Sequence, residues 1–128
     1  MRNVEIEKKE DNMKEINWET FESVDLRVGT IIKSEPFPEA RKPAIKVWVD
    51  FGEELGVKQS SAQITVNYEP EALIGKQVIG CVNLGTMRIA GFKSEFLLTG
   101  FAADDSSIVL ANPDTTSDKK IPNGAKLC

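Results

Sequence analysis

The chain has 128 residues, of which 41% are hydrophobic and 28% charged, a balance that excludes an intrinsically disordered protein. It has no histidine and no apolar run near the roughly 18 residues of a membrane span, which argues against imidazole-based chemistry and a membrane protein. The net charge of −4 arises mostly at the ends, since residues 23–103 carry nine acidic and nine basic side chains.

The N-terminal segment is expected to lie outside the folded domain. Residues 1–13 are rich in charge and too polar for a secretory signal, which predicts a mobile extension and a cytoplasmic protein. Asn17 is a good N-cap for a short helix over residues 18–21. Ile16, Trp18 and Phe21 give this segment an apolar face. One domain is expected over residues 14–128.

From Val24 the apolar residues recur at every second position, which predicts β-strands. Gly29 interrupts the first strand before Ile31 and predicts a bulge or a sharp bend there. Three prolines between residues 35 and 43 predict a loop. Further strands are predicted over residues 45–51, 57–65, 77–84 and 95–102, with a short piece at 108–110 and a short helix over 70–74.

This order of elements predicts an all-β fold. Five strands, the first one long and bent, with a short helix between strands 3 and 4, are typical of a five-stranded OB-fold barrel, here preceded by a short N-terminal helix. An OB barrel presents one sheet face and its loops to oligonucleotides. The alternative is an all-β sandwich, which usually has more strands.

The chemistry-bearing residues do not form a catalytic pattern. Cys81 and Cys128 share no metal-binding or redox spacing. The adjacent carboxylates at 53–54 and 104–105 fall in turns, where successive side chains diverge. The sequence therefore predicts a binding protein that is not an enzyme and has no cofactor and no metal site.

Two runs, Val24–Ile31 (VDLRVGTI) and Asn83–Leu98, carry a family resemblance. In the second run an Asn-Leu pair is followed by a basic loop, a glycine and a Ser-Glu pair. Both resemble the tRNA-binding OB domains found in the EMAP II cytokine and as extensions of some methionyl- and phenylalanyl-tRNA synthetases. The resemblance covers residues 14–128. It implies an OB-fold homodimer whose interface is built from the N-terminal segment and the C-terminal strands.

Other runs are similar to the CsaA branch of this family, which consists of proposed secretion chaperones. The synthetase-type domains usually have Gly-Met after the Ser-Glu pair, whereas this chain has Phe96-Leu97. The resemblance to the CsaA branch is carried by residues 37–44, 50–52, 58–65 and 73–79. The ligand therefore stays open between RNA and unfolded polypeptide.

For tRNA or another structured RNA, the barrel face must offer long cations to phosphates and aromatic rings to unpaired bases. A chain that is neutral in its middle can still present a basic face, because phosphate contacts respond to the local potential. For Ser94, a turn closed by side-chain hydrogen bonds is an equal alternative to ligand binding. The RNA-binding candidates are Arg27, Arg41, Lys42, Lys46, Lys58, Ser60, Arg88, Lys93 and Ser94.

An export-related chaperone that binds unfolded or pre-secretory polypeptide would need an apolar groove that tolerates many side chains. The candidates for such a groove are Phe37, Trp48, Met87 and Phe92. Ordinary burial is an equal alternative for Trp48, and the three aromatic residues are also candidates for base stacking.

Overall fold

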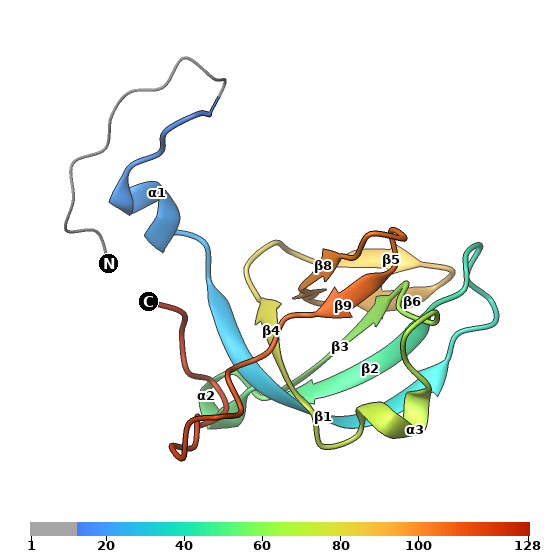
Figure 1. Ribbon diagram of the computed structural model, residues 1–128. Helices are drawn as coiled ribbons and strands as arrows, with labels where there is room; N and C mark the ends of the chain where they lie inside the picture. Colours follow the sequence, from blue (N-terminus) through green and yellow to red (C-terminus); the bar gives the residue numbers. More distant parts are fainter. Residues whose placement is uncertain (1–12) are drawn as a thin grey trace.

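The computed structural model describes residues 13–128, so the predicted extension lies outside the described residues except for Met13. Strands dominate this part of the chain, and its helices are short (Figure 1). The elements are α1 Trp18–Glu22, β1 Leu26–Pro36, β2 Ile45–Asp50, α2 Gly52–Leu55, β3 Val57–Ala62, α3 Pro70–Leu73, β4 Gln77–Cys81, β5 Met87–Ile89, β6 Phe92–Ser94, β7 Leu97–Leu98, β8 Gly100–Ala102 and β9 Ile108–Leu110.

Five strands form one antiparallel sheet in the order β3-β2-β1-β4-β7, which coils into a nearly closed barrel. The alternation in β2 explains the two faces of this sheet, because Ile45, Val47 and Val49 are buried while Lys46 and Trp48 are only half-buried. The inward residues pack with Phe51 and other apolar side chains into one core. The predicted OB-type fold is confirmed, including the short helix between the third and fourth strands.

The predicted N-cap of α1 is confirmed. The Asn17 Oδ1 accepts a hydrogen bond of 2.7 Å from the backbone N–H of Thr20. The helix buries none of its own residues, although Trp18 and Phe21 contact each other edge to face. Figure 1 shows α1 standing away from the barrel at the end of the segment that leads into β1.

Strand β1 lies between β2 and β4 in the sheet and pairs with both. Its residues 26–30 pair with β4 and its residues 30–36 pair with β2. β1 runs unbroken through Gly29 and its register shift lies between Ile31 and Lys33, so a bulge predicted at Gly29 is wrong in position. Gly29 is needed for a different reason, since a Cβ there would lie 2.5 Å from Cγ1 of Val49.

The segment between β4 and β7 differs from the prediction. Residues 87–94, expected as a basic loop, form the antiparallel hairpin β5–β6, in which Arg88 lies opposite Lys93. Its tight turn places Ala90 and Gly91 at φ values of 49° and 83°, the backbone that a two-residue hairpin turn needs. The predicted strand over 95–102 is divided into β7 and β8, because β8 leaves the sheet to pair with β9.

Side chains close the barrel between its edge strands β3 and β7. The backbone N–H of Glu95 donates to the Gln59 carbonyl at 2.8 Å, and the Glu95 carboxylate accepts from the Gln59 N–H at 3.0 Å. The buried Ser60 hydroxyl donates to the Phe96 carbonyl at 2.6 Å and lies 2.9 Å from the Ser94 hydroxyl. We call residues 59–60 and 94–96 the seam.

Replacing Ser60 by alanine is expected to lower the free energy of unfolding by about 1–3 kcal/mol, because the Phe96 carbonyl would lose its buried partner. Chemical denaturation measures this difference. Ser61→Ala is the matched control, since within residues 13–128 no side-chain hydrogen bond involves Ser61. Equal stability of the two variants would show that the seam does not depend on this hydroxyl.

Candidate nucleic-acid interface

Three aromatic rings pack on the outer face of the sheet beside the β5–β6 hairpin. The ring centroid of Phe92 lies 5.5 Å from that of Phe37 and 5.8 Å from that of Trp48, and both contacts are edge to face. Phe37 is buried, and Trp48 and Phe92 are half-buried. We call these three residues the aromatic cluster.

Two lysines cover the aromatic cluster. The Lys46 Nζ lies 4.7 Å from the Phe37 centroid and 4.9 Å from that of Phe92, and the Lys33 Nζ lies 4.5 Å from the Trp48 centroid. Lys33 was not among the sequence candidates. The signal that identifies it is the strand register, because Lys33 in β1 is the cross-strand partner of Trp48 in β2.

Gln59 connects the aromatic cluster to the hairpin. Its side-chain oxygen accepts from the Trp48 indole N–H at 3.0 Å, and its side-chain N–H donates to the Lys93 carbonyl at 2.8 Å. Because the rings contact one another and carry lysines on their faces, the cluster fixes the hairpin to the sheet. Phe37 is buried by these contacts, whereas Trp48 and Phe92 keep part of their ring surfaces open.

An open groove lies beside the hairpin, and three predicted cations border it. Arg41 and Lys42 come from the loop between β1 and β2, and Arg88 comes from β5. All three are exposed, and none has an ion pair within residues 13–128. The apolar residues that line the groove include Ala44, Ile64, Ile89, Leu97, Leu98 and Ile108. With the exposed Lys93 opposite Arg88, we call Arg41, Lys42, Arg88 and Lys93 the cationic rim.

Other candidates take different positions. Lys58 is half-buried near the start of β3, whereas Met87, 66% exposed, begins the hairpin. Ser60 is only 1% exposed, and its hydroxyl is used in the seam with Ser94. The expectation that Ser60 offers a polar group at the surface is corrected by this burial. The groove has a separate apolar lining, to which Phe37, Trp48, Met87 and Phe92 do not contribute.

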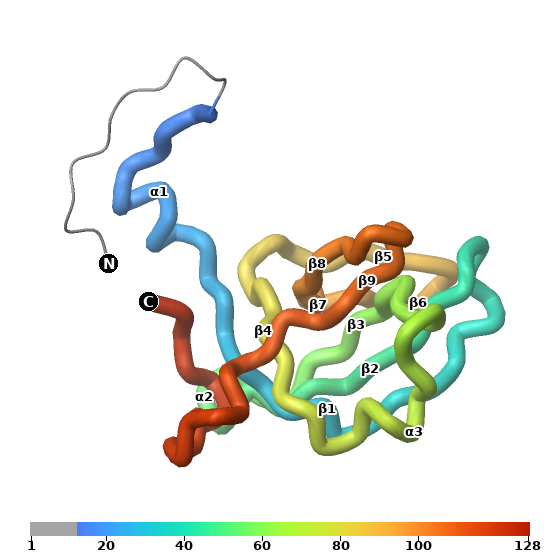
Figure 2. The backbone as a smooth tube through the Cα atoms, viewed as in Figure 1, coloured from blue at the N-terminus to red at the C-terminus, as the bar shows by residue number. Residues whose placement is uncertain are grey.

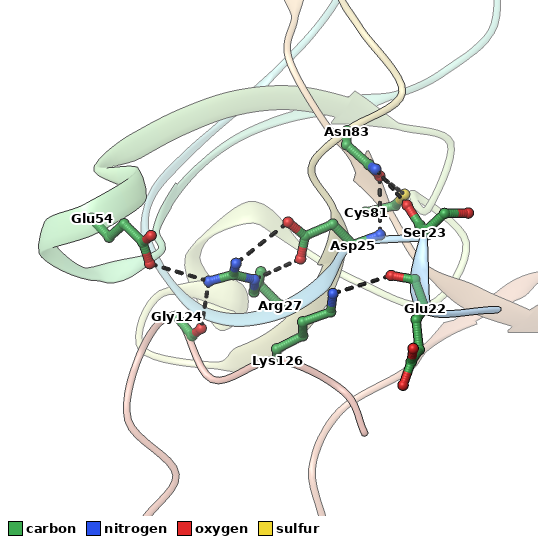
Figure 3. A network of polar contacts seen from close by, with 9 residues as sticks. All are labelled: Glu22, Ser23, Asp25, Arg27, Glu54, Cys81, Asn83, Gly124 and Lys126. Atoms are coloured by element: carbon green, nitrogen blue, oxygen red, sulfur yellow. Dashed lines mark hydrogen bonds and ion pairs between the residues drawn. The ribbon is translucent and has the colours of Figure 1, made fainter. Parts of the chain in front are cut away.

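Arg27 lies away from the cationic rim, in a network that holds the C-terminal tail (Figure 3). Its guanidinium donates to the Asp25 carboxylate at 2.6 Å and to the Gly124 carbonyl at 3.0 Å, and lies 3.5 Å from Glu54. The hydrogen bond and charge of Asp25 raise the pKa of Arg27. We call Arg27 with these three partners the Arg27 clamp.

Further bonds join the tail and the start of β1. Asn83 accepts from the Asp25 N–H at 3.0 Å and donates to the Ser23 carbonyl at 2.7 Å, while Lys126 donates to the Glu22 carbonyl at 3.2 Å. Figure 2 shows the tail running beside the start of β1, far from the β5–β6 hairpin. The network therefore joins the C-terminal tail to the segment that leads into β1, and it adds nothing to the cationic rim.

Arg27→Ala is expected to destabilise the protein by about 1.5–3 kcal/mol, the range for hydrogen bonds to a charged group. Amide exchange should accelerate at Gly124 and Leu127, whose N–H groups donate to Val28 and Leu26. Hydrogen-exchange mass spectrometry measures the change, with the exposed Arg88→Ala as control. Unchanged exchange in the tail would contradict the role of the clamp.

Residues 13–128 contain neither a cluster of metal-binding side chains nor a membrane-spanning helix. No group of three or more histidine, cysteine, aspartate or glutamate side chains in this range could hold a metal ion. None of the helices described there has the length and apolar character needed to cross a membrane.

The fold and its basic loops define a class: an OB-type barrel with a cationic face beside its sheet. Residues 26–126 match the family model described as a putative tRNA binding domain. The chain therefore belongs to this family of tRNA-binding domains. It is 33% identical over 117 residues to a methionine–tRNA ligase of Methanocaldococcus jannaschii, a match that covers 91% of this chain but only 17% of the ligase.

Solved structures show a similarity over nearly the whole chain. The chaperone CsaA from Bacillus anthracis is 48% identical, with a TM-score of 0.80, and the match covers 90% of this chain and 100% of that one. CsaA from Picrophilus torridus is 39% identical, also with a TM-score of 0.80, over 89% of this chain and 100% of that one. The resemblance to the CsaA branch inferred from the sequence is confirmed.

Proposed function

We propose that this protein binds tRNA, or RNA of similar structure, without catalysis and in the cytoplasm, through the cationic rim. The observation that carries the proposal is the gathering of Arg41, Lys42, Arg88 and Lys93 on the two segments that flank the binding face of an OB barrel. Membership of a tRNA-binding domain family supports the same ligand.

The arrangement favours contacts to phosphates over contacts to bases. The rim cations are exposed and have no ion pair within the described residues, whereas the rings of the aromatic cluster are packed against one another. Phosphate contacts position RNA without reading its sequence, so the RNA would be selected mainly by its shape. The net charge of −4 opposes long-range attraction, which makes binding depend on these local cations.

Removing rim charges should reduce both the affinity for tRNA and its salt dependence. For Arg41→Gln/Arg88→Gln, we expect the slope of log K against log salt to become shallower by about 0.7–0.9 for each phosphate that the variant no longer neutralises. Fluorescence anisotropy with labelled tRNA over a range of KCl concentrations measures the slope.

The matched control for this experiment is Lys119→Gln, since Lys119 is also exposed but lies in the C-terminal tail, where it borders a different pocket. The control should bind as the wild type does. No measurable affinity of the wild type for tRNA at low salt would contradict RNA binding altogether. A slope that falls equally in the control would contradict the assignment to the rim.

We also propose that the protein is a homodimer, as the family resemblance implies. A five-residue helix that buries none of its own residues is too short to be stable alone. Trp18 and Ile16 are each 63% exposed, and Leu127 of the tail is 45% exposed, so both terminal segments carry apolar side chains that the barrel does not cover. A second copy covering these residues would stabilise α1 and would double the number of rim cations available to one RNA.

Sedimentation equilibrium tests the dimer. We expect a mass of two chains at micromolar concentration and a shift toward one chain for Trp18→Asp, which places a charge among the exposed apolar side chains. Glu19→Gln, a neighbouring exposed change, is the control. A wild-type mass near 14.1 kDa would contradict the proposal.

A second candidate function is binding of unfolded polypeptide. The specific observation in its favour is the groove, whose apolar lining differs from the polar surface expected of a purely electrostatic RNA site. The two CsaA structures from Bacillus anthracis and Picrophilus torridus are described as chaperones, which supports the same ligand class.

A further inference from the structure

The seam closes only part of the boundary between the edge strands. Residues 59–60 are hydrogen-bonded to residues 95–96, so β3 and the segment that leads into β7 run side by side in the same direction there. Beyond this point the boundary is open, because the groove is lined by residues 61–64 on one side and 97–100 on the other. Two strand edges therefore face the same groove.

The phase of the hydrogen bonds shows which main-chain groups face the groove. In an antiparallel pair only alternate residues exchange hydrogen bonds with the neighbouring strand. The main chain of Gln59 is bonded across the seam to Glu95, so that of Ser61, two residues on, also points away from β2. Gln63, just beyond β3, has no main-chain hydrogen bond within residues 13–128.

The same reasoning applies to the opposite wall. The N–H of Thr99 donates to the Ile79 carbonyl of β4, so Thr99 belongs to the ladder between β4 and β7. Because main-chain groups of successive residues point to opposite sides of a strand, the N–H and C=O of Leu98 point away from β4, toward the open boundary. Unpaired main-chain groups thus border the groove on both sides.

We propose that the open boundary between β3 and β7 binds one extended polypeptide segment as an added strand. The segment would pair with the edge of β3 at Ser61 and Gln63, as peptides do at other exposed sheet edges. This inference rests on the second candidate function, polypeptide binding, and specifies its site and its geometry.

The lining of the groove defines the chemistry of the segment. Side chains of an added strand alternate, so every second residue would enter the apolar part formed by Ile64, Leu98 and Ile108. The remaining residues would point toward the rim, where Arg41, Lys42 and Arg88 favour carboxylates. The expected ligand is therefore an extended segment in which apolar and acidic residues alternate.

A strand is a better occupant of these edges than a nucleotide. Successive main-chain groups on a strand edge recur at a fixed spacing, which a second strand matches residue by residue. The hydrogen-bonding groups of a base lie on edges of one small ring system and do not repeat at the spacing of a strand, so a base would leave most of these groups without partners. The position of the unpaired groups therefore favours polypeptide inside the groove, while RNA phosphates are expected at the rim.

The test uses a fluorescein-labelled peptide of alternating valine and glutamate and the same peptide N-methylated at every second residue, on the edge that would face β3. Anisotropy should show binding of the first peptide and about tenfold weaker binding of the second, which lacks the donors for pairing. In the wild-type protein, bound peptide should slow amide exchange at Ser61 and Gln63, measured by NMR.

Ser61→Pro removes the N–H on the open side of β3, where an edge proline is tolerated, and should also weaken binding about tenfold. Ser61→Val keeps this N–H and separates the loss of the donor from the change of side chain, so it should bind more tightly than Ser61→Pro. Equally weak binding of both variants would contradict pairing at this N–H. Affinity for tRNA, measured in parallel, reports that the proline variant is folded.

The outcomes separate the two proposals. If the peptide binds but N-methylation has no effect and the Ser61 and Gln63 amides gain no protection, strand addition is overturned while polypeptide binding stands. If neither peptide binds, both are overturned. Protection of the same two amides by tRNA but not by peptide would assign the groove to RNA and would also overturn the inference.

Discussion

Gln59, Ser60 and Glu95 close the barrel with hydrogen bonds from their side chains, in a place where main-chain pairing alone is incomplete. An OB-type sheet has two edge strands, and edges with unpaired main-chain groups are costly to bury and prone to pair with other chains. Here the edges meet for only two residues of β3. The buried Ser60 hydroxyl and the Glu95 carboxylate supply the hydrogen bonds that the regular ladder lacks.

The position of the seam determines what lies on each side of it. The Gln59 side chain extends from the seam to both Trp48 and Lys93, so the same residue aligns the aromatic cluster and the hairpin. With the hairpin fixed, Arg88 borders the same groove as Arg41 and Lys42, and Lys93 lies opposite Arg88 in the hairpin. Past Ser60 the strands are no longer bridged, and the groove opens between them. The hydrogen bonds of the seam therefore determine both where the barrel is closed and where the groove is open.

Local patterns in the sequence predicted the parts of the fold that depend on neighbouring residues. The alternation of β2, the Asn17 cap and the helix between β3 and β4 each follow from contacts within a few positions. The hairpin β5–β6 was missed because its residues mix charge and apolar character, and its turn places Ala90 at a positive φ that alanine rarely adopts. The bulge lies at Ile32. An isoleucine gives no sign of a bulge in the sequence, because the position depends on how β1 pairs with its neighbouring strands.

In the candidate site, too, the sequence did not predict contacts between residues that are distant in the chain. Loop cations such as Arg41 were identified from charge alone, and the structure brings them together with Arg88. Arg27 has the same charge, but its partners Asp25 and Gly124 include one that is 97 residues away in sequence, a contact that no local pattern could reveal. Ser60 looked like a surface polar residue, although strand phase turns its side chain inward. The chemistry of each side chain could be predicted, but its direction required the register of the sheet.

The two proposed ligands are coupled through the cations that they share. Arg41, Lys42 and Arg88 would contact RNA phosphates from the rim and acidic side chains of a peptide from the groove. When one ligand neutralises these charges, the attraction available to the other falls, and by linkage the effect is the same in both directions. An uncharged extended peptide would use the strand edge without this competition. The balance between the two ligands would therefore depend on the acidity of the polypeptide, while the edge of β3 would bind extended chains of either kind.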